Sequence, residues 1–362
     1  MTEILNTPGM VIDAAVVRRN LKRMADYCAA HRLQLRPHTK THKSIRLGRM
    51  QVDNGAVGLT VAKVGEAQVM TEASNDILMA YPAVDPWRCE ALAALAKSKT
   101  IRVAIDSAEA AQALADAAAS AGSTIGILVD IDVGMHRTGV LNPQAALELA
   151  QVISSKRGLR LDGVMFYPGH VGGPVTQQIP ALKAIDAILG ETKALWQSKG
   201  LECKIVSGGS TPTGFQSHAM SHLTEIRPGT YIFNDMNCVA GGFAQIEDCA
   251  ARIICTVIST AVSKQFVIDA GTKTLTSDRC GPAPDSGHGR ILEYPDARIV
   301  KLTEEHGQVD VSASARTPKI GERLTVIPNH ICPCVNLQDR VWWCESDGSL
   351  QPLNVDARGK LN

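Results

Sequence analysis

A lysine between two histidines is the first feature of the chain that suggests covalent chemistry. It lies in the run Leu-Arg-Pro-His-Thr-Lys-Thr-His-Lys at residues 35–43, where Lys40 has further cations on both sides at Arg36 and Lys43. Positively charged neighbours oppose another positive charge, which lowers the preference of a lysine for its protonated form. A neutral lysine amine is the nucleophile of Schiff-base chemistry. The run is therefore either a reactive lysine site or a basic loop on a solvated surface.

Two later loops have the composition of an anion-binding site. One is Ser-Gly-Gly-Ser at residues 207–210, and the other is Pro-Gly-Thr-Tyr at residues 228–231. Glycine lets backbone N–H groups approach an anion, and hydroxyl groups add further donors. Each loop alone is equally well explained as an ordinary turn. A phosphate site in the same active-site mouth as Lys40 would indicate pyridoxal phosphate.

Two other predicted strand ends carry side chains that suit a cofactor ring. Arg137 is a permanent donor for a pyridine nitrogen, although it is as readily explained as a surface partner of Asp132. Tyr167 offers an aromatic ring or a phenol beside the cofactor, and His170 is a candidate acid or base. A lone histidine is more often structural, so His170 is the weaker of these candidates.

A histidine and a cysteine two residues apart form a candidate metal site near the C-terminus. In an extended segment residues i and i+2 face the same side, so His330 and Cys332 can bind one ion. A nitrogen and a thiolate favour Zn²⁺ without excluding other ions. Two protein ligands leave positions open for substrate or water. Cys334 lies on the same predicted face and is an alternative ligand; the other interpretation is buried thiols beside a hydrogen-bonded histidine.

Hydrophobic periodicity places most of these residues at the ends of strands. The predicted strands are residues 34–37, 58–61, 76–80, 100–105, 124–133, 159–167, 202–206 and 224–227. The predicted helices run from an Asp13 cap to Cys28 and over residues 86–96, 107–121, 143–153 and 180–198, with prolines at three starts and Ser107 as an N-cap. Strands that alternate with helices in this way indicate a (β/α)8 barrel, whose active sites lie at the C-terminal strand ends.

A doubly wound open sheet is the main competing architecture, but no Gly-x-Gly-x-x-Gly follows the first strand. After about residue 241 short β-like runs separated by turn residues replace the βα pattern. We therefore predict a barrel domain over residues 11–240 and a mostly β domain over residues 241–362, to which residues 1–10 contribute a strand.

The composition excludes several classes of partner. With 362 residues the chain is long enough for two domains, and its net charge of +1 gives no reason to expect nucleic acid or an anionic membrane. No apolar run is long enough to span a membrane, and the N-terminus lacks the features of a signal peptide. We therefore expect a cytoplasmic protein whose ten cysteines are reduced.

At this point the motifs resemble those of the D-threonine aldolase and D-serine dehydratase family, pyridoxal-phosphate enzymes of fold type III, the alanine racemase type. The resemblance covers nearly the whole chain and rests on the lysine run, the Asp-Val-Gly and Tyr-Pro-Gly-His motifs, the two glycine loops and the Pro-Asn-His-x-Cys-Pro motif. It implies roles for the following residues: Lys40 as the cofactor lysine and a catalytic residue; Arg137 at the pyridine nitrogen; Ser207, Gly209, Gly229 and Thr230 at the phosphate; His330 and Cys332 at a divalent metal. It also implies a head-to-tail homodimer with active sites at the interface.

The leading functional prediction is a metal-assisted lyase that cleaves D-3-hydroxy amino acids into glycine and an aldehyde, as a D-threonine aldolase does. Lys40 would hold the cofactor, and His170 or a metal-bound water would take the proton of the 3-hydroxyl group beside a zinc, manganese or magnesium ion. The alternative is a zinc-dependent dehydratase of D-serine or D-3-hydroxyaspartate, which the cysteine at position 332 favours. A non-catalytic cofactor carrier and a metal-independent racemase fit less well, because neither needs the predicted metal site.

Overall fold

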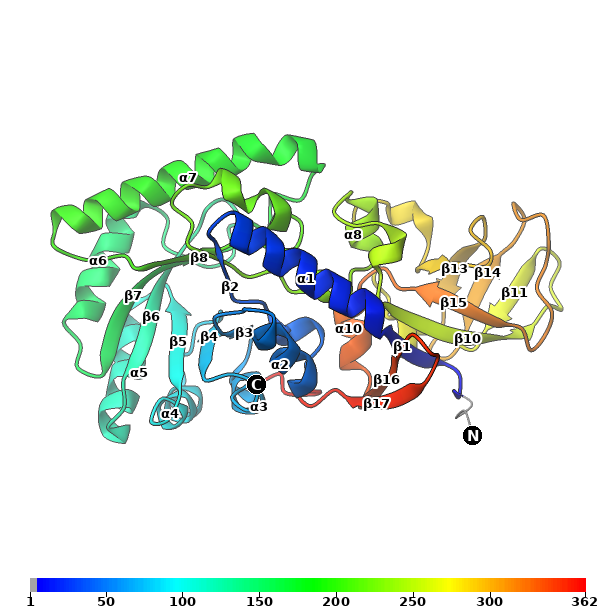
Figure 1. Cartoon of the computed structure of the whole chain (residues 1–362), viewed down its shortest axis with the longest axis horizontal. Helices are drawn as coiled ribbons and strands as arrows, with labels where there is room; N and C mark the ends of the chain where they lie inside the picture. The colour runs from blue at the N-terminus through cyan, green and yellow to red at the C-terminus, as the bar shows by residue number, and fades with distance from the viewer. Residues whose placement is uncertain (1–4) are drawn as a thin grey trace. The chain divides into compact units, whose positions relative to one another are not determined.

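The computed structural model describes residues 5–362, and any part of the predicted N-terminal strand in residues 1–4 lies outside the described range. The chain divides into two compact units. One comprises Arg23–Gly229 with Gly359–Asn362, and the other comprises the chain up to Lys22 with Thr230–Arg358. Figure 1 labels their elements. We call them the barrel unit and the β unit and describe each by itself.

The barrel unit contains eight parallel strands: β2 (Gln34–Leu35), β3 (Leu59–Val61), β4 (Asp76–Met79), β5 (Thr100–Ile105), β6 (Ile125–Ile131), β7 (Leu159–Phe166), β8 (Ile205–Gly208) and β9 (Glu225–Ile226). Their order in the sheet is β2-β9-β8-β7-β6-β5-β4-β3. A parallel bridge between His38 and Thr60 joins the two ends of this sheet. The predicted (β/α)8 barrel is therefore confirmed, and the open sheet is excluded because both edges are paired.

Helices alternate with the strands, as Figure 1 shows: α1 (Ala14–Ala30, which begins in the β unit), α2 (Ile45–Asp53), α3 (Val64–Met70), α4 (Pro86–Leu95), α5 (Ala108–Ala121), α6 (Pro143–Ser154) and α7 (Val175–Ser198). Two prolines open helices as predicted, at Pro86 and Pro143. The Ser107 side chain accepts a hydrogen bond from the Ala110 N–H and so caps α5. Asp85 and Asn142 cap α4 and α6 in the same way, so short side chains before these three helices satisfy backbone donors that have no partner inside them.

The start of α7 differs from the prediction. The helix begins at Val175 after Pro174, and Pro180 lies inside it, so the predicted start at Pro180 was wrong. A proline inside a helix removes one backbone hydrogen bond. The first turn is held in another way, because the Gln178 amide donates to the carbonyls of Gly173 and Pro212, at 3.1 Å each.

The interior of the barrel has an apolar layer and an ionic layer. The apolar layer comprises Leu78, Ala104, Leu128 and Met165 from four consecutive strands. Side chains two residues apart on a strand share a face. Asp76 and Arg102, two residues before Leu78 and Ala104, therefore place charged groups beneath this layer. The ionic chain runs Glu225, Arg36, Asp76, Arg102, Asp162 and Arg160, in that order of contacts.

The β unit is built on a nine-stranded sheet: β1 (Gly9–Asp13), β10 (Ala251–Ser259), β11 (Gln265–Ile268), β12 (Arg290–Ile291), β13 (Arg298–Leu302), β14 (Gly307–Asp310), β15 (Arg323–Ile327), β16 (Arg340–Cys344) and β17 (Leu350–Asn354). Its short helices are α8 (Met236–Ala240), α9 (Thr272–Leu275) and α10 (Ile331–Asn336). β1 pairs antiparallel with β10 and parallel with β16, so the N-terminal segment belongs to this sheet. Within the described residues no helix has the length and hydropathy needed to cross a membrane.

Candidate functional sites

Lys40 lies on a single turn of 3-10 helix, η1 (Thr39–Thr41), just beyond the C-terminal end of β2. The turn is closed at its start by His38, whose Nδ1 accepts a hydrogen bond from the Lys40 N–H at 3.3 Å. It is closed at its end by the Lys43 N–H, which donates to the Thr39 carbonyl at 2.8 Å. Lys40 is exposed, whereas His38 and His42 on either side are buried. The lysine therefore projects from a buried and well-ordered base.

Lys43 has a different environment from Lys40. Its Nζ lies 2.7 Å from Glu66 Oε1, and the two side chains are only 5% and 2% exposed. A buried ammonium group without its carboxylate would be strongly destabilising. Lys43 is therefore structural, and Lys40 is the lysine of this run that is free to reach a ligand.

The lysine segment packs directly on the two predicted phosphate loops. The His38 N–H donates to the Pro228 carbonyl at 3.0 Å, and a Cβ atom added to Gly229 would lie 3.2 Å from the His38 Cβ. The Arg227 N–H donates in turn to the Gly208 carbonyl at 2.9 Å. The segment that carries Lys40 and the loops after β9 and β8 therefore form one continuous rim at the C-terminal ends of the strands.

This rim contains polar groups that lack a hydrogen-bond partner among residues 5–362. Ser207 is fully buried, yet its Oγ has no partner there, and the Nε of buried Arg227 has none either. Gly209 has φ +78°, a conformation that favours glycine, and this turns the backbone after β8. Buried polar groups normally have partners, so free donors beside a glycine turn fit an anionic ligand such as the phosphate of pyridoxal phosphate.

The other predicted cofactor residues lie on the loops after β6 and β7. The Arg137 guanidinium lies over the Tyr167 ring, 4.8 Å from its centroid. The alternative partner of Arg137, Asp132, instead contacts His136, with 2.8 Å between Asp132 Oδ2 and His136 Nδ1. A Cβ atom on Gly134 would lie 3.0 Å from His170 Nε2, so the exposed His170 ring packs against the same loop. The structure thus brings Arg137, Tyr167 and His170 to neighbouring loops at the barrel mouth.

The sequence analysis missed two residues at this mouth, Asp130 and Arg227. Asp130 is 4% exposed near the end of β6, and burial raises the pKa of its carboxyl group to about 6. Its Oδ2 accepts a hydrogen bond from Thr138 at 2.8 Å, which opposes that rise in pKa. Burial lowers the pKa of Arg227, whose Nη2 donates to the Phe166 carbonyl at 2.6 Å. The signal in the sequence was their spacing: Asp130 lies two residues after inward-facing Leu128 on β6, and Arg227 directly follows β9.

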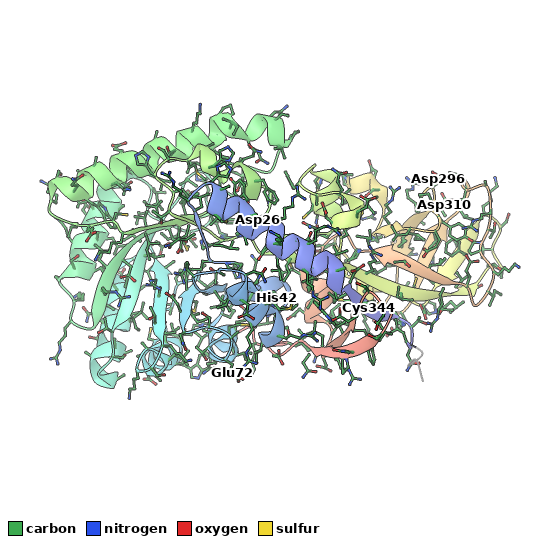
Figure 2. The ribbon with its side chains drawn as sticks, in the orientation of Figure 1. Asp26, His42, Glu72, Asp296, Asp310 and Cys344 are labelled. Atoms are coloured by element: carbon green, nitrogen blue, oxygen red, sulfur yellow. The ribbon has the colours of Figure 1, made fainter. Side chains whose placement is uncertain are left out.

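The two histidines beside Lys40 are neutral groups of the interior. Burial lowers the pKa of His42 to about 4 and holds the pKa of His38 well below 6.5. The positive charge of Lys40 contributes to the lowering at His38. Figure 2 shows His42 within the barrel unit, whereas exposed Glu72 lies at its edge. Both histidines support the turn under Lys40 rather than titrate near neutral pH.

The candidate metal ligands lie in the β unit, on a segment that is not extended as predicted. His330 is the N-cap of helix α10 and Cys332 lies in its first turn, because Ile331–Asn336 forms a helix. A hydrogen bond to Cys332 is the largest cause of a rise in the pKa of His330 to about 9. A histidine nitrogen and a thiol sulfur are donor types that fit a divalent ion such as Zn²⁺.

Two neighbours of this pair change the predicted ligand set. The Cys334 thiol donates to the carbonyls of His330 and Leu275, at 3.3 and 3.4 Å, and its side chain is fully buried. Cys334 is therefore turned away from the pair, and its prediction as an alternative ligand was wrong, because helix α10 separates the faces of residues 332 and 334. The Thr230 hydroxyl lies 3.7 Å from the Cys332 sulfur. Thus a predicted phosphate residue lies next to a predicted metal ligand.

Backbone contacts hold in place residues 328–332, which carry His330 and Cys332 and which we call the metal segment. The Met236 and Asn237 N–H groups donate to the carbonyls of Pro328 and Asn329, each at 3.1 Å. The buried Asp235 carboxylate accepts from the Ile331 N–H at the start of α10. Among the described residues no three histidine, cysteine or acidic side chains converge on one point. The described side chains therefore offer two candidate ligands rather than a closed structural site.

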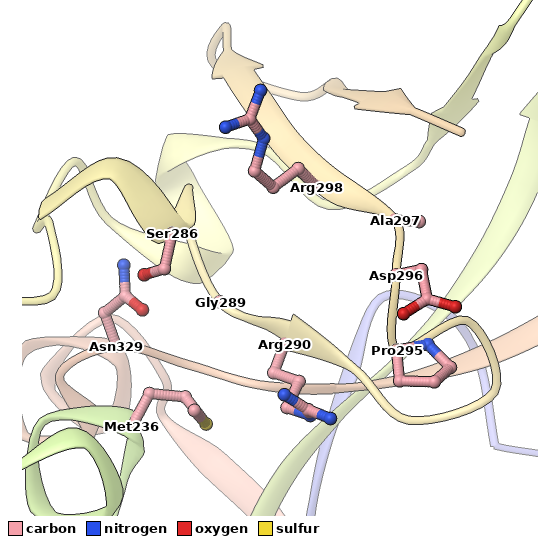
Figure 3. A pocket seen from close by; sticks show the side chains of 9 residues that line it. All are labelled: Met236, Ser286, Gly289, Arg290, Pro295, Asp296, Ala297, Arg298 and Asn329. Atoms are coloured by element: carbon pink, nitrogen blue, oxygen red, sulfur yellow. The ribbon is translucent and has the colours of Figure 1, made fainter. Parts of the chain in front are cut away.

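A pocket of about 260 Å³ adjoins this segment (Figure 3). Asn329 and Ser286 line one side, with the Asn329 amide directed toward the segment that carries Ser286, and Asp296 and Arg298 line the other. Neither His330 nor Cys332 lines it. The pocket is therefore separate from the pair formed by His330 and Cys332, although Asn329, which lines the pocket, directly precedes His330 in the chain.

Comparisons with known proteins match the chain over almost its full length. A model of the alanine racemase N-terminal domain matches residues 12–236, and a model of a serine dehydratase domain matches residues 250–344. A D-threonine aldolase of Arthrobacter sp is 31% identical over 98% of this chain and 93% of its own. A D-threo-3-hydroxyaspartate dehydratase of Delftia sp. is 32% identical over 96% of each chain.

Solved structures agree with these matches. A D-threonine aldolase from Filomicrobium marinum superposes with a TM-score of 0.92 at 29% identity, over 99% of this chain and 97% of the other. Structures of D-threo-3-hydroxyaspartate dehydratase variants have TM-scores of 0.90 at 28% and 29% identity, over 97% of this chain. One variant replaces a histidine by alanine, and the other, in a metal-free form, replaces a cysteine two positions later. That spacing is the spacing of His330 and Cys332.

Proposed function

Since the chain belongs to the family of D-threonine aldolases and D-serine dehydratases, lyases of the alanine racemase fold that depend on pyridoxal phosphate, we propose that it cleaves D-3-hydroxy amino acids of the D-threonine type into glycine and an aldehyde. The observation that carries this proposal is the continuous rim formed by the Lys40 segment and the loops after β8 and β9. It gives one barrel mouth both a free lysine and unpaired donors for an anion.

Each predicted cofactor residue has a place in this proposal. Lys40 would bind the cofactor covalently, and Arg137 and Tyr167 would hold its ring. The residues that would hold its phosphate are Ser207, Gly209, Gly229 and Thr230. When bound, pyridoxal phosphate supplies an electron sink for the carbanion that forms at Cα of the substrate. The buried base formed by His38 and His42 keeps the Lys40 turn in position throughout.

The proposed roles of His330, Cys332 and His170 concern the 3-hydroxyl group of the substrate. His330 and Cys332 would hold a divalent ion of the zinc, manganese or magnesium class, which would supply Lewis acidity. His170 is the base that accepts the proton of this hydroxyl group, because its ring lies at the barrel mouth beside the β6 loop. Loss of that proton leads to cleavage of the Cα–Cβ bond.

A dehydratase is the second candidate function, and the cysteine at position 332 favours it. The dehydratase from Delftia is as similar to the chain as the aldolase from Arthrobacter, and variants of a D-threo-3-hydroxyaspartate dehydratase at a histidine and a cysteine of the same spacing have been solved. In this reaction Lys40 removes the α-proton, and the 3-hydroxyl group leaves as water. D-serine and D-3-hydroxyaspartate are the expected substrates.

The proposal includes a homodimer in the cytoplasm. Large apolar side chains are exposed after β4 and β6: Val84 and Leu141 in loops and Trp87 in the first turn of α4 are 56%, 78% and 48% exposed. A second copy packed head to tail is the occupant that we propose for these apolar side chains. Sedimentation should give a dimer for the wild type and a larger monomer fraction for Trp87→Glu. All ten cysteines are free thiols, which supports a reducing compartment.

The decisive experiment is incubation of the holoenzyme with D-threonine, D-serine and D-3-hydroxyaspartate, with and without a chelator. Glycine and acetaldehyde from D-threonine support the aldolase, whereas ammonia and a 2-oxo acid support the dehydratase. Activity that persists after complete metal removal would refute the role of His330 and Cys332. Turnover retained by Lys40→Ala would refute the whole scheme, and Lys40→Ala is expected to fold because the replaced side chain is exposed.

A further inference from the structure

A carboxylate contacts the proposed metal ligand His330 from a distant part of the chain. Asp278 Oδ2 lies 2.8 Å from His330 Nδ1. An ionised carboxylate only accepts hydrogen bonds, so this contact requires a hydrogen atom on Nδ1. The Nε2 atom of the neutral ring then carries the free electron pair that a metal ion needs. We propose that Asp278 is a positioning residue that fixes His330 in the orientation and tautomer in which Nε2 binds the ion.

Asp278 is itself held firmly enough to perform this function. The Asn329 amide donates to the Asp278 carbonyl at 3.0 Å and to the Gly287 carbonyl at 2.8 Å. Asn329 is 2% exposed and directly precedes His330 in the chain. The Asp278 N–H donates to the Thr276 hydroxyl at 3.3 Å. The residue before the histidine thus ties the loop that carries Asp278 to the metal segment.

The surroundings of Asp278 indicate that it positions His330, and that it neither binds the metal ion itself nor contributes much to the stability of the fold. Within the part of the chain that the structure describes, no group of three potential ligands converges, so Asp278 does not form a common site with His330 and Cys332. The Asp278 and His330 side chains are 44% and 42% exposed. Ion pairs this accessible contribute little to the free energy of unfolding. Loss of the Asp278 carboxylate should therefore leave the fold intact and affect the metal.

Carboxylates that contact metal-bound histidines commonly change metal affinity by 10- to 100-fold. We therefore expect Asp278→Ala to weaken Zn²⁺ binding by about 10- to 100-fold, and Asp278→Asn by less, since its amide oxygen still accepts the Nδ1 hydrogen bond. The measurement is competition for Zn²⁺ between the holoenzyme and a chromophoric chelator. Co²⁺ absorption provides a second readout, because a tilted imidazole changes the ligand-field bands.

Asp285→Asn is the matched control, since Asp285 is an exposed carboxylate on the same loop region and its removal changes the net charge equally. It should bind Zn²⁺ as the wild type does, and all three variants should unfold at the wild-type temperature. Unchanged Zn²⁺ affinity and Co²⁺ spectrum in Asp278→Ala would overturn the positioning role.

This inference rests on the proposed metal function. Two further variants, His330→Ala and Cys332→Ala, distinguish a wrong metal site from a wrong role for Asp278. His330→Ala should lose the ion. If His330→Ala and Cys332→Ala both bind Zn²⁺ normally, the proposed metal site is wrong, and the role of Asp278 fails with it. If they lose Zn²⁺ but Asp278→Ala retains wild-type affinity, the metal site stands and only the positioning role is refuted.

Discussion

His42 Nε2 lies 3.2 Å from Gln51 Oε1 in the interior of the barrel unit. On the other side of the ring the Ser44 N–H donates to His42 Nδ1 at 3.1 Å. A nitrogen that accepts a hydrogen bond carries no hydrogen, so these contacts select the neutral tautomer with hydrogen on Nε2. The histidine beside the proposed cofactor lysine is thus held uncharged by two residues of its own unit.

This arrangement predicts how stability depends on pH. The folded pKa of His42 is about 4, that of His38 is also lowered, and both are near 6.5 in the unfolded chain. Between these values the unfolded state binds protons that the folded state does not, so the free energy of unfolding falls as the pH drops below about 6.5. For His42 the loss amounts to at most about 3 kcal/mol by pH 4.

Urea unfolding at several pH values between 7.5 and 4.5 measures this loss. His42→Asn should reduce the slope with pH, although it lowers stability at neutral pH. His306→Gln, at an exposed histidine of the β unit, should leave the slope unchanged. A wild-type stability that is constant from pH 7 to pH 5 would contradict the buried, neutral state of the two histidines.

Ser207→Ala separates stability from cofactor binding. The Ser207 hydroxyl is buried without a partner, so its removal should leave the stability of the cofactor-free protein unchanged or raise it by up to about 1 kcal/mol. The same change removes a proposed phosphate donor and should weaken pyridoxal-phosphate binding several-fold. Cofactor titration followed by absorbance, together with thermal unfolding, tests both parts. A drop in stability with no change in affinity would show that Ser207 is structural only.

Breaking the ionic chain inside the barrel should be costly. Asp162 is 5% exposed and accepts hydrogen bonds from Arg102 and Arg160, at 2.7 Å and 2.5 Å. Asp162→Asn removes the carboxylate charge between Arg102 and Arg160 and leaves Arg102 paired with Asp76 alone, so it should lower the free energy of unfolding by about 2 kcal/mol. The exposed pair of Asp339 and Arg358 is the control, and Asp339→Asn should cost about 0.5 kcal/mol or less. Equal effects of the two variants would refute the interior ionic layer.

The two cysteines of α10 should respond differently to alanine. Cys332→Ala removes a proposed ligand and should lower metal content and activity at least 100-fold with little effect on folding. Cys334→Ala removes a buried thiol that donates to two carbonyls, so it should lower stability by about 1 kcal/mol or more and leave the metal bound. Elemental analysis of the purified variants, combined with thermal unfolding, distinguishes them. Loss of metal from Cys334→Ala alone would reverse the assignment.

The sequence by itself determined the barrel, the β sheet and the rim of the candidate cofactor site. Periodicity and turn residues are local signals, and the strand predicted over residues 100–105 has the observed bounds. The rule that barrel sites lie at C-terminal strand ends then placed Lys40 and the two glycine loops on one mouth. The observed hydrogen bond between His38 and Pro228 agrees with that placement.

Only the tertiary structure distinguished residues of the same type from one another. Lys40 and Lys43 are three residues apart, yet Lys43 alone is buried against Glu66, a contact that no local pattern encodes. Asp278 and His330 lie 52 residues apart and meet because the β unit folds their loops together. Helix α10 likewise turned Cys334 away from the pair formed by His330 and Cys332. Spacing along the chain identifies candidate site residues, whereas burial and long-range packing decide which of these residues is solvated, paired or free to bind a ligand.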